Sequence, residues 1–262
     1  MHRLCLIVGL GLGMMASLAP ESFAIEFRID TKLFAAGNKA PTGRNLTLFA
    51  GGAVYDFAGE ITPDGVPATQ QEIAILDTRR LKFVLLDTTR EVKTEIDCGE
   101  LHRFAEDLRN EARESKNPAV KFSADPKFTE NFNRTGGLLE LTSGVIDYRV
   151  ETVRPDSTAA SDQYGLFADR YAELNTTHPG AAPALPRIHL NSVLVKHGVI
   201  PARVERTIVG PGSQKSTAWT EHQVSWQLTR TDRTEITKAD RLQVEYKLIK
   251  FTEYRQIAPM KK

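Results

Sequence analysis

Residues 73–96 read IAILDTRRLKFVLLDTTREVKTEI, and this stretch decides the fold class. Two apolar runs, Ile73–Leu76 and Leu81–Leu86, flank a polar turn at residues 77–80, which is typical of a β-hairpin. Because both runs are apolar at consecutive positions, we expect central strands that are covered on both faces. The amphipathic segment Glu91–Ile96 follows and predicts a further strand with one exposed face.

Strand patterns also precede this hairpin. From Ile25 to Leu33 apolar and charged residues alternate, which predicts a strand with one buried face. Leu46–Phe49 and Val54–Phe57 flank Gly51 and Gly52, and this arrangement predicts a second hairpin whose turn uses the positive φ that glycine allows. The N-terminal half is therefore expected to be an antiparallel meander.

Three helices are expected to cover the sheet. Asp97–Glu100 resembles a capping box that opens the first helix, with an apolar stripe that starts at Leu101. Ser161 is expected to cap a second amphipathic helix. The third helix has Pro186 in its first turn and ends at Gly198.

The remaining strand patterns are Val120–Ser123, Phe128–Phe132, Leu138–Thr142, Val145–Val153, Ala202–Val209 and Thr217–Thr229. Near the C-terminus, Thr237–Asp240 favours a helix start, whereas the alternation from Leu242 to Leu248 also favours a strand. We expect a helix up to about Tyr246 and extended chain beyond it. The sum predicts the α+β class: a curved, mostly antiparallel, half-barrel-like sheet with about three covering helices, in a single domain over residues 25–262.

The first 24 residues have the layout of a secretory signal peptide. His2 and Arg3 precede an apolar run from Leu4 to Ala19, and Ser22–Ala24 resembles a cleavage site. The run is shorter than the ~20 residues of a membrane span, and no later segment is apolar enough to cross a bilayer. We expect an exported protein, periplasmic or secreted, in which Cys98 alone remains and has no intramolecular partner.

Charge and motifs exclude several function classes. The chain has 34 Lys and Arg against 33 Asp and Glu, interspersed throughout, which gives no footprint for nucleic acid. No histidine spacing suits a metal site, and no phosphate loop or nucleophile elbow is present, so neither a metal nor a cofactor is expected. Cys98 lies at a predicted helix start, which lowers a thiol pKa, but Asp97 and Glu100 act oppositely.

Aromatic residues supply the candidate binding site. Tyr164, Phe167, Tyr171 and Trp226 belong to elements expected to border one sheet face. Core packing explains such residues, but a concave sheet that helices close incompletely leaves aromatic side chains lining a pocket. We therefore take these four as candidate ligand-binding residues for an apolar small molecule or lipid.

Three segments carry a family resemblance: Val54–Phe57, Phe83–Glu91 and Tyr171–Asn175 resemble an uncharacterised family of exported bacterial proteins. The order of elements is also similar to that of the periplasmic lipoprotein-carrier family, whose fold is a half-barrel. The chain departs from that family because residues after the signal begin in the strand Ile25–Leu33 rather than in a covering helix. The resemblance implies a carrier fold and assigns no functional residue.

These observations predict an exported, noncatalytic protein that binds an apolar or lipid ligand in a sheet concavity. Two alternatives stay open. One is a cell-envelope interaction module with a fully packed core and an exposed apolar patch. The other is a hydrolase with an unrecognised site, for which His222, His189 and Cys98 are the candidate residues.

Overall fold

The computed structural model describes residues 25–60, 72–178 and 180–256, so the predicted signal segment at 1–24 lies outside the described residues. The described strands form one open, curved sheet in the order β12-β6-β5-β4-β3-β2-β1-β11-β10-β9-β8-β7. Neighbouring strands are antiparallel except for the parallel pair β12 and β6. The predicted α+β class with a curved, mostly antiparallel sheet is confirmed.

The first half of the sheet is a meander of six strands, in which each strand pairs antiparallel with the next one along the chain. Its members are β1 (Phe27–Phe34), β2 (Gly43–Ala50), β3 (Ala53–Glu60), β4 (Glu72–Asp77), β5 (Lys82–Asp87) and β6 (Val92–Asp97). Gly51 and Gly52 have φ values of 60° and 85° in the β2–β3 turn, as the sequence predicts.

The second half is a meander too, and it joins the first through β1 and β11. Its members are β7 (Thr129–Asn133), β8 (Leu138–Thr142), β9 (Ile146–Val153), β10 (Ile200–Val209) and β11 (Lys215–Ser225). The two-residue strand β12 (Lys247–Leu248) extends the opposite edge. The first and last long strands of the chain therefore pair at the centre of the sheet.

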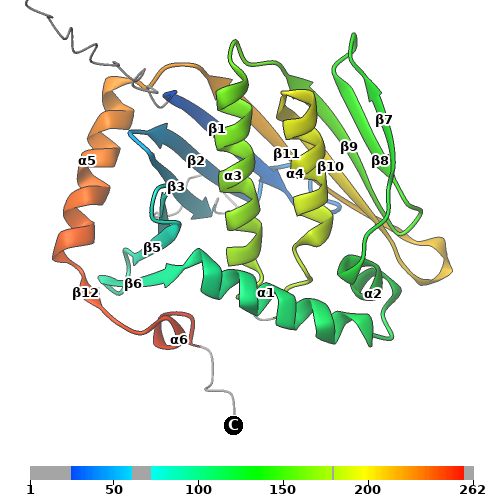
Figure 1. The fold of residues 1–262 in the computed structure, drawn as a ribbon, viewed down its shortest axis with the longest axis horizontal. Coiled ribbons are helices and arrows are strands. Elements are labelled where there is room, and N and C mark those ends of the chain that lie inside the picture. Colours follow the sequence, from blue (N-terminus) through cyan, green and yellow to red (C-terminus); the bar gives the residue numbers. More distant parts are fainter. Residues whose placement is uncertain (1–24, 61–71, 179, 257–262) are drawn as a thin grey trace, which may run out of the picture.

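Four helices lie on the concave side of the sheet (Figure 1). Helices α3 (Thr158–Asn175) and α4 (Leu185–His197) run side by side across the strands, while α1 (Cys98–Arg113) and α2 (Pro118–Ala124) cross their lower end. Helix α4 ends at Gly198, which has the left-handed φ of 65° that this cap requires. A short helix, α6 (Phe251–Tyr254), follows β12.

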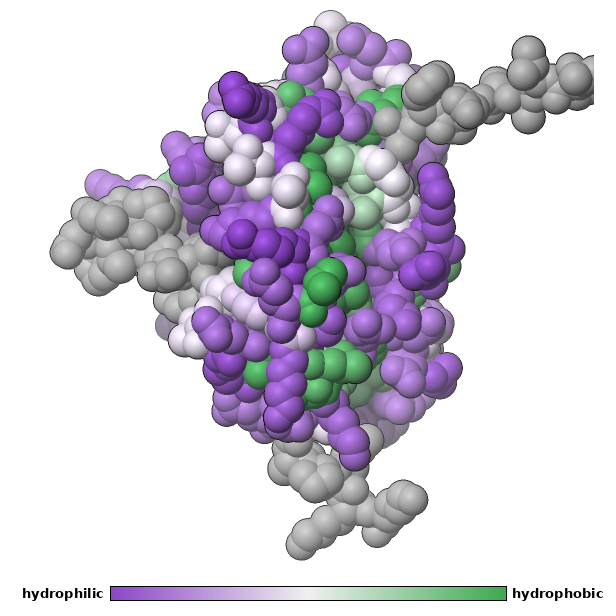
Figure 2. Space-filling model, turned by 90° about the vertical axis from the view of Figure 1, so that its left-hand side faces the viewer, coloured by the Kyte–Doolittle hydropathy of each residue, from purple (hydrophilic) through white to green (hydrophobic). Residues whose placement is uncertain are grey.

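Helix α5 (Arg230–Glu245) covers the opposite, convex side. Its Ala239 and Leu242 pack on apolar side chains of β2 to β5, including Leu48, Ile75 and Leu86. Figure 2 views the molecule from the side on which α5 lies, and hydrophilic side chains cover most of that surface. No helix within the described ranges is long and apolar enough to cross a membrane.

The sheet therefore has two apolar cores. The larger core fills the concave side and includes Phe27, Phe49 and Phe83, while the smaller core lies under α5. Strands β4 and β5 contribute alternate side chains to both cores, which confirms that they are covered on both faces.

The structure corrects several predicted boundaries. The strand predicted at Val120–Ser123 is helix α2, because Asn117 caps it and Pro118 occupies its first turn. Helix α3 is capped by Ser157, four residues before Ser161, whose hydroxyl instead donates to the Thr158 carbonyl at 2.7 Å. The first error concerns the type of element, since Asn117-Pro118 ends one helix in the prediction but starts α2 in the structure. The second arises because Ser157 and Ser161 are both suitable capping residues.

The C-terminal region differs most from the predicted elements. The strand predicted to reach Thr229 ends at Ser225, and Thr229 with Asp232 forms the reciprocal capping box that starts α5. The predicted start at Thr237–Asp240 is therefore wrong. The predicted helix end near Tyr246 is confirmed, since α5 stops at Glu245. The chain beyond it is extended at β12, as predicted, but then forms the short helix α6. The described residues also hold more helices than the three predicted, α1 to α6.

Candidate functional site

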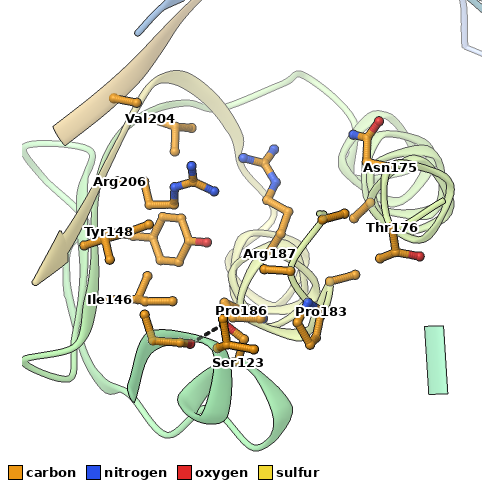
Figure 3. Close-up of a pocket in the computed structure, with 18 of the residues that line it drawn as sticks. Ser123, Ile146, Tyr148, Asn175, Thr176, Pro183, Pro186, Arg187, Val204 and Arg206 are labelled. Carbon is orange, nitrogen blue, oxygen red and sulfur yellow. Dashed lines mark hydrogen bonds between the residues drawn. The ribbon is translucent and has the colours of Figure 1, made fainter. Parts of the chain in front are cut away.

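A cavity of about 650 Å³ opens between the concave sheet face and the helices (Figure 3). Strands β1, β9, β10 and β11 form one wall, and α2, the end of α3, the start of α4 and residues 181–184 form the other. The helix-side wall includes the small side chains of Ala181, Ala182 and Ala184. We call this space the outer chamber.

The outer chamber is mainly apolar, with two positive charges. Ile146, Val204 and Ile208 line its sheet wall, and no Asp or Glu occurs among the described residues that surround it. Arg187 enters from α4 and Arg206 from β10. In Figure 3 their guanidinium groups and the Tyr148 ring point into the same space.

A second space of about 260 Å³, the inner chamber, continues toward the first half of the sheet. Ala172, Asn175, Arg187 and Thr220 line both chambers, so the two spaces adjoin. Arg187 is fixed at this boundary because its Nη2 donates a hydrogen bond of 2.8 Å to the Tyr164 hydroxyl. The hydroxyl of a buried tyrosine thus orients the arginine without neutralising it.

Polar side chains run in a row across the sheet floor of the inner chamber. Asp56 on β3 is 2% exposed, and its carboxylate accepts hydrogen bonds from Thr47 Oγ1 at 2.6 Å and Asn45 Nδ2 at 2.9 Å. Tyr171 on α3 also donates to it. Burial outweighs these bonds and raises the pKa of Asp56 from 3.8 to about 6.

His222 on β11 continues the row. Its Nδ1 lies 2.9 Å from Thr31 Oγ1 and its Nε2 2.8 Å from Thr220 Oγ1, so both ring nitrogens have hydroxyl partners. Burial, with Arg187 adding repulsion, lowers the pKa of His222 from 6.5 to about 3. The ring is therefore neutral at physiological pH.

Three of the four predicted ligand-binding residues come together. Tyr164, Phe167 and Tyr171 line the inner chamber from α3. Trp226 lies on neither chamber wall; it follows the end of β11, is 38% exposed, and tilts its ring against Phe27 at 5.8 Å between ring centroids. A ligand-binding role for these four residues stays a prediction.

Sequence reasoning missed the polar members of the site: Asp56, Arg187 and Arg206. Asp56 occupies an inward position of β3 between the apolar residues Val54 and Ala58. Arg206 occupies an inward position of β10 between the apolar residues Val204 and Ile208. A charged residue at an inward strand position was the available signal, since such a side chain faces either a core or a cavity. Arg187, in the first turn of a helix, carried no such signal.

The residues considered for hydrolysis lie apart. Cys98 is buried at the start of α1, and burial raises the pKa of its thiol to about 11, which disfavours a thiolate. His189 packs against the Phe128 ring at 5.1 Å between centroids. Within the described ranges no three His, Cys, Asp or Glu side chains are grouped so as to hold a metal ion.

Comparison with known proteins places the chain in no family. No family model matches it, and no curated protein matches it. A solved structure of PNGF-II aligns with a TM-score of 0.39 and 10% identity, covering 89% of this chain and 33% of that one. The β subunit of the DNA polymerase of Streptococcus pyogenes aligns with a TM-score of 0.12 and 9% identity, over 83% of this chain and 61% of that one. The chain thus spans about a third of PNGF-II, and these likenesses are too low to carry an argument.

Proposed function

We propose that this protein binds an apolar or lipid-like small molecule in the outer chamber and does not transform it chemically. The observation that carries the proposal is the open space of about 650 Å³ between the concave sheet face and the helices, with the inner chamber adjoining it. This volume lies within the ~300–1,000 Å³ range of ligand pockets, which are also mostly apolar with a few polar groups. Burial of the ligand's apolar surface would drive binding, at about 25 cal/mol per Å².

The surrounding packing supports binding rather than catalysis. The thiol of Cys98 is buried with a raised pKa, and the ring nitrogens of His222 are occupied by two threonine hydroxyls. Neither group is placed to activate a nucleophile. The open chamber also favours a binding protein over an interaction module with a filled core.

Native mass spectrometry of protein purified gently from its host, followed by lipid extraction, tests this proposal. A bound apolar species at near-stoichiometric amount is the expected result. In Ala218→Trp the indole would project from β11 into the outer chamber and fill part of it, so the bound species should be lost. The matched control is Gln223→Trp, which places the same side chain at an exposed position of β11 that lines neither chamber. A wild-type protein that is consistently free of ligand would contradict the proposal.

We also propose that residues 1–24 direct export, so that the protein acts in the periplasm or outside the cell. The basic start, apolar run and small-residue end of this segment support the proposal. N-terminal sequencing of the protein recovered from each cell fraction tests it. A mature chain that starts at Ile25 outside the cytoplasm is expected, and a chain that keeps Met1 in the cytoplasm would overturn it.

A further inference from the structure

The charge around the outer chamber is one-sided. Arg187 and Arg206 are both wall residues, and neither forms a salt bridge within the described part of the chain. Asp169 is the carboxylate whose charge interacts with Arg187, and its own hydrogen bond is with Asn191 Nδ2, at 2.8 Å. A cavity with two guanidinium groups and no acidic wall residue favours an anion.

The start of helix α4 adds to this preference. Ala184 and Pro186 line the chamber at the helix N-terminus, and no side chain caps that end. The N-terminal end of a helix carries partial positive charge, so it favours an anionic group nearby. The helix end, Arg187 and Arg206 therefore act in the same direction.

Apolar surface continues directly beside these charges. Ile146, Val204 and Ile208 lie on the wall shared with Arg206, on strands β9 and β10. Val120 of α2 and Pro183 face the same chamber from the helix side. Along β10, Arg206 lies between Val204 on one side and Ile208, which pairs with Ile146, on the other. An anionic head held at Arg206 therefore has aliphatic surface beside it, at Ile146 and Ile208, for a chain.

From this arrangement we infer that the ligand is a single-chain amphiphile with an anionic head, a carboxylate or a phosphate monoester, held between Arg187 and Arg206 with its chain along Ile146 and Ile208. The inference rests on the proposed binding function and adds the class of ligand. Asp56 keeps the anionic head out of the inner chamber, because its carboxylate lies at the far side of that space, held by Thr47 and Asn45.

The inference is tested by measuring, with titration calorimetry, the affinity of the delipidated protein for four probes. The probes are palmitate, 1-palmitoyl lysophosphatidate, hexadecan-1-ol and hexadecyltrimethylammonium, which share a chain and differ in head. At least one anionic probe should bind about tenfold or more tightly than hexadecanol, and the cationic probe more weakly than hexadecanol. The stronger of the two anionic probes identifies the head as carboxylate or phosphate.

Substitution locates the head. Arg206→Gln, at an exposed residue, should lower the affinity for the anionic probe about tenfold more than the affinity for hexadecanol, and so remove most of the preference for the anionic head. Arg187→Lys retains the charge and should retain the preference in part. The matched control Arg149→Gln removes an exposed positive charge from β9, outside both chambers, and should change neither affinity.

The outcomes separate the two proposals. If none of the four probes binds the wild type, the binding function itself fails. If hexadecanol binds as tightly as both anionic probes, or if Arg206→Gln and Arg149→Gln lower anionic affinity equally, the binding function stands and the anionic head is overturned.

Discussion

The two halves of the sheet differ in how they are covered. Strands β3 to β5 lie between α5 on the convex side and the main core on the concave side, and apart from Asp56 on β3 their buried residues on both faces are apolar. Strands β9 to β11 have a charged convex face, with pairs such as Arg203–Glu221 at 3.1 Å, and a cavity on the concave face. The half that is covered on both faces buries enough apolar surface to stabilise the fold, so the other half can contain a cavity.

The largest effect should come from the doubly covered half. Phe83→Ala removes a ring with 0% exposure and should lower the free energy of unfolding by about 3–5 kcal/mol. Ile208→Ala, on the chamber wall, should cost about 1 kcal/mol or less, since its side chain already borders open space. Urea denaturation of both variants checks the contrast, and equal losses would show that the halves are equally packed.

The next effect concerns Asp56, which belongs to a packed strand but lines the inner chamber. Its pKa is higher in the folded state than in the unfolded chain, so its stabilising contribution is complete below about pH 4 and is lost as the pH rises through about 6. A pKa difference of one corresponds to about 1.4 kcal/mol. Between pH 4 and pH 7, the free energy of unfolding of Asp56→Asn should therefore rise by about 2–3 kcal/mol relative to that of the wild type.

Urea midpoints at the two pH values measure this gain. The difference between variant and wild type is needed because His222, whose pKa is lowered, acts with the opposite sign: its contribution is complete above about pH 6.5 and is lost as the pH falls toward 3. A variant whose stability relative to wild type does not change with pH would contradict a raised pKa for Asp56.

A smaller change in stability is expected at the contact between α3 and α4, the two helices that lie over the chambers. Gly165 of α3 leaves no room for a Cβ, which would lie 2.3 Å from Val195 Cγ2 of α4. Alanine for glycine inside a helix ordinarily stabilises by about 0.5–1 kcal/mol, but Gly165→Ala should destabilise by about 1–2 kcal/mol because the helices must separate. Thermal unfolding checks this.

Val195→Ala is the matched background for that experiment. With Val195 shortened, the added methyl has space, so Gly165→Ala should become neutral or stabilising there. Destabilisation of the same size in both backgrounds would locate its cause outside the contact of α3 with α4.

The smallest effect should come from the charged convex face. Glu221→Gln breaks the exposed pair with Arg203 and should change the free energy of unfolding by less than about 0.5 kcal/mol, because exposed ion pairs contribute little. A loss above about 1 kcal/mol in urea denaturation would show that this face is covered, and would remove the contrast between the halves.

Much of the fold was predictable because its signals are local. The Gly51–Gly52 turn, the alternation from Ile25 to Leu33 and the Gly198 stop each depend on a few adjacent residues. The errors occur where adjacent residues offer competing signals: Asn117-Pro118 both follows one helix and starts another. The site was predictable only in part, since helix periodicity places Tyr164, Phe167 and Tyr171 on one face but cannot say what that face opposes.

The sequence by itself determined the strand and helix periods, the hairpin connections and the two-sided burial of β4 and β5, because hydrophobic periodicity and turn residues act over short distances along the chain. The tertiary structure alone decided that β1 pairs with β11, that Trp226 stands apart from the chambers, and that Arg187 and Arg206 face one cavity. These outcomes depend on contacts between segments that are far apart in the sequence, and such long-range packing is set by the whole core rather than by any local pattern.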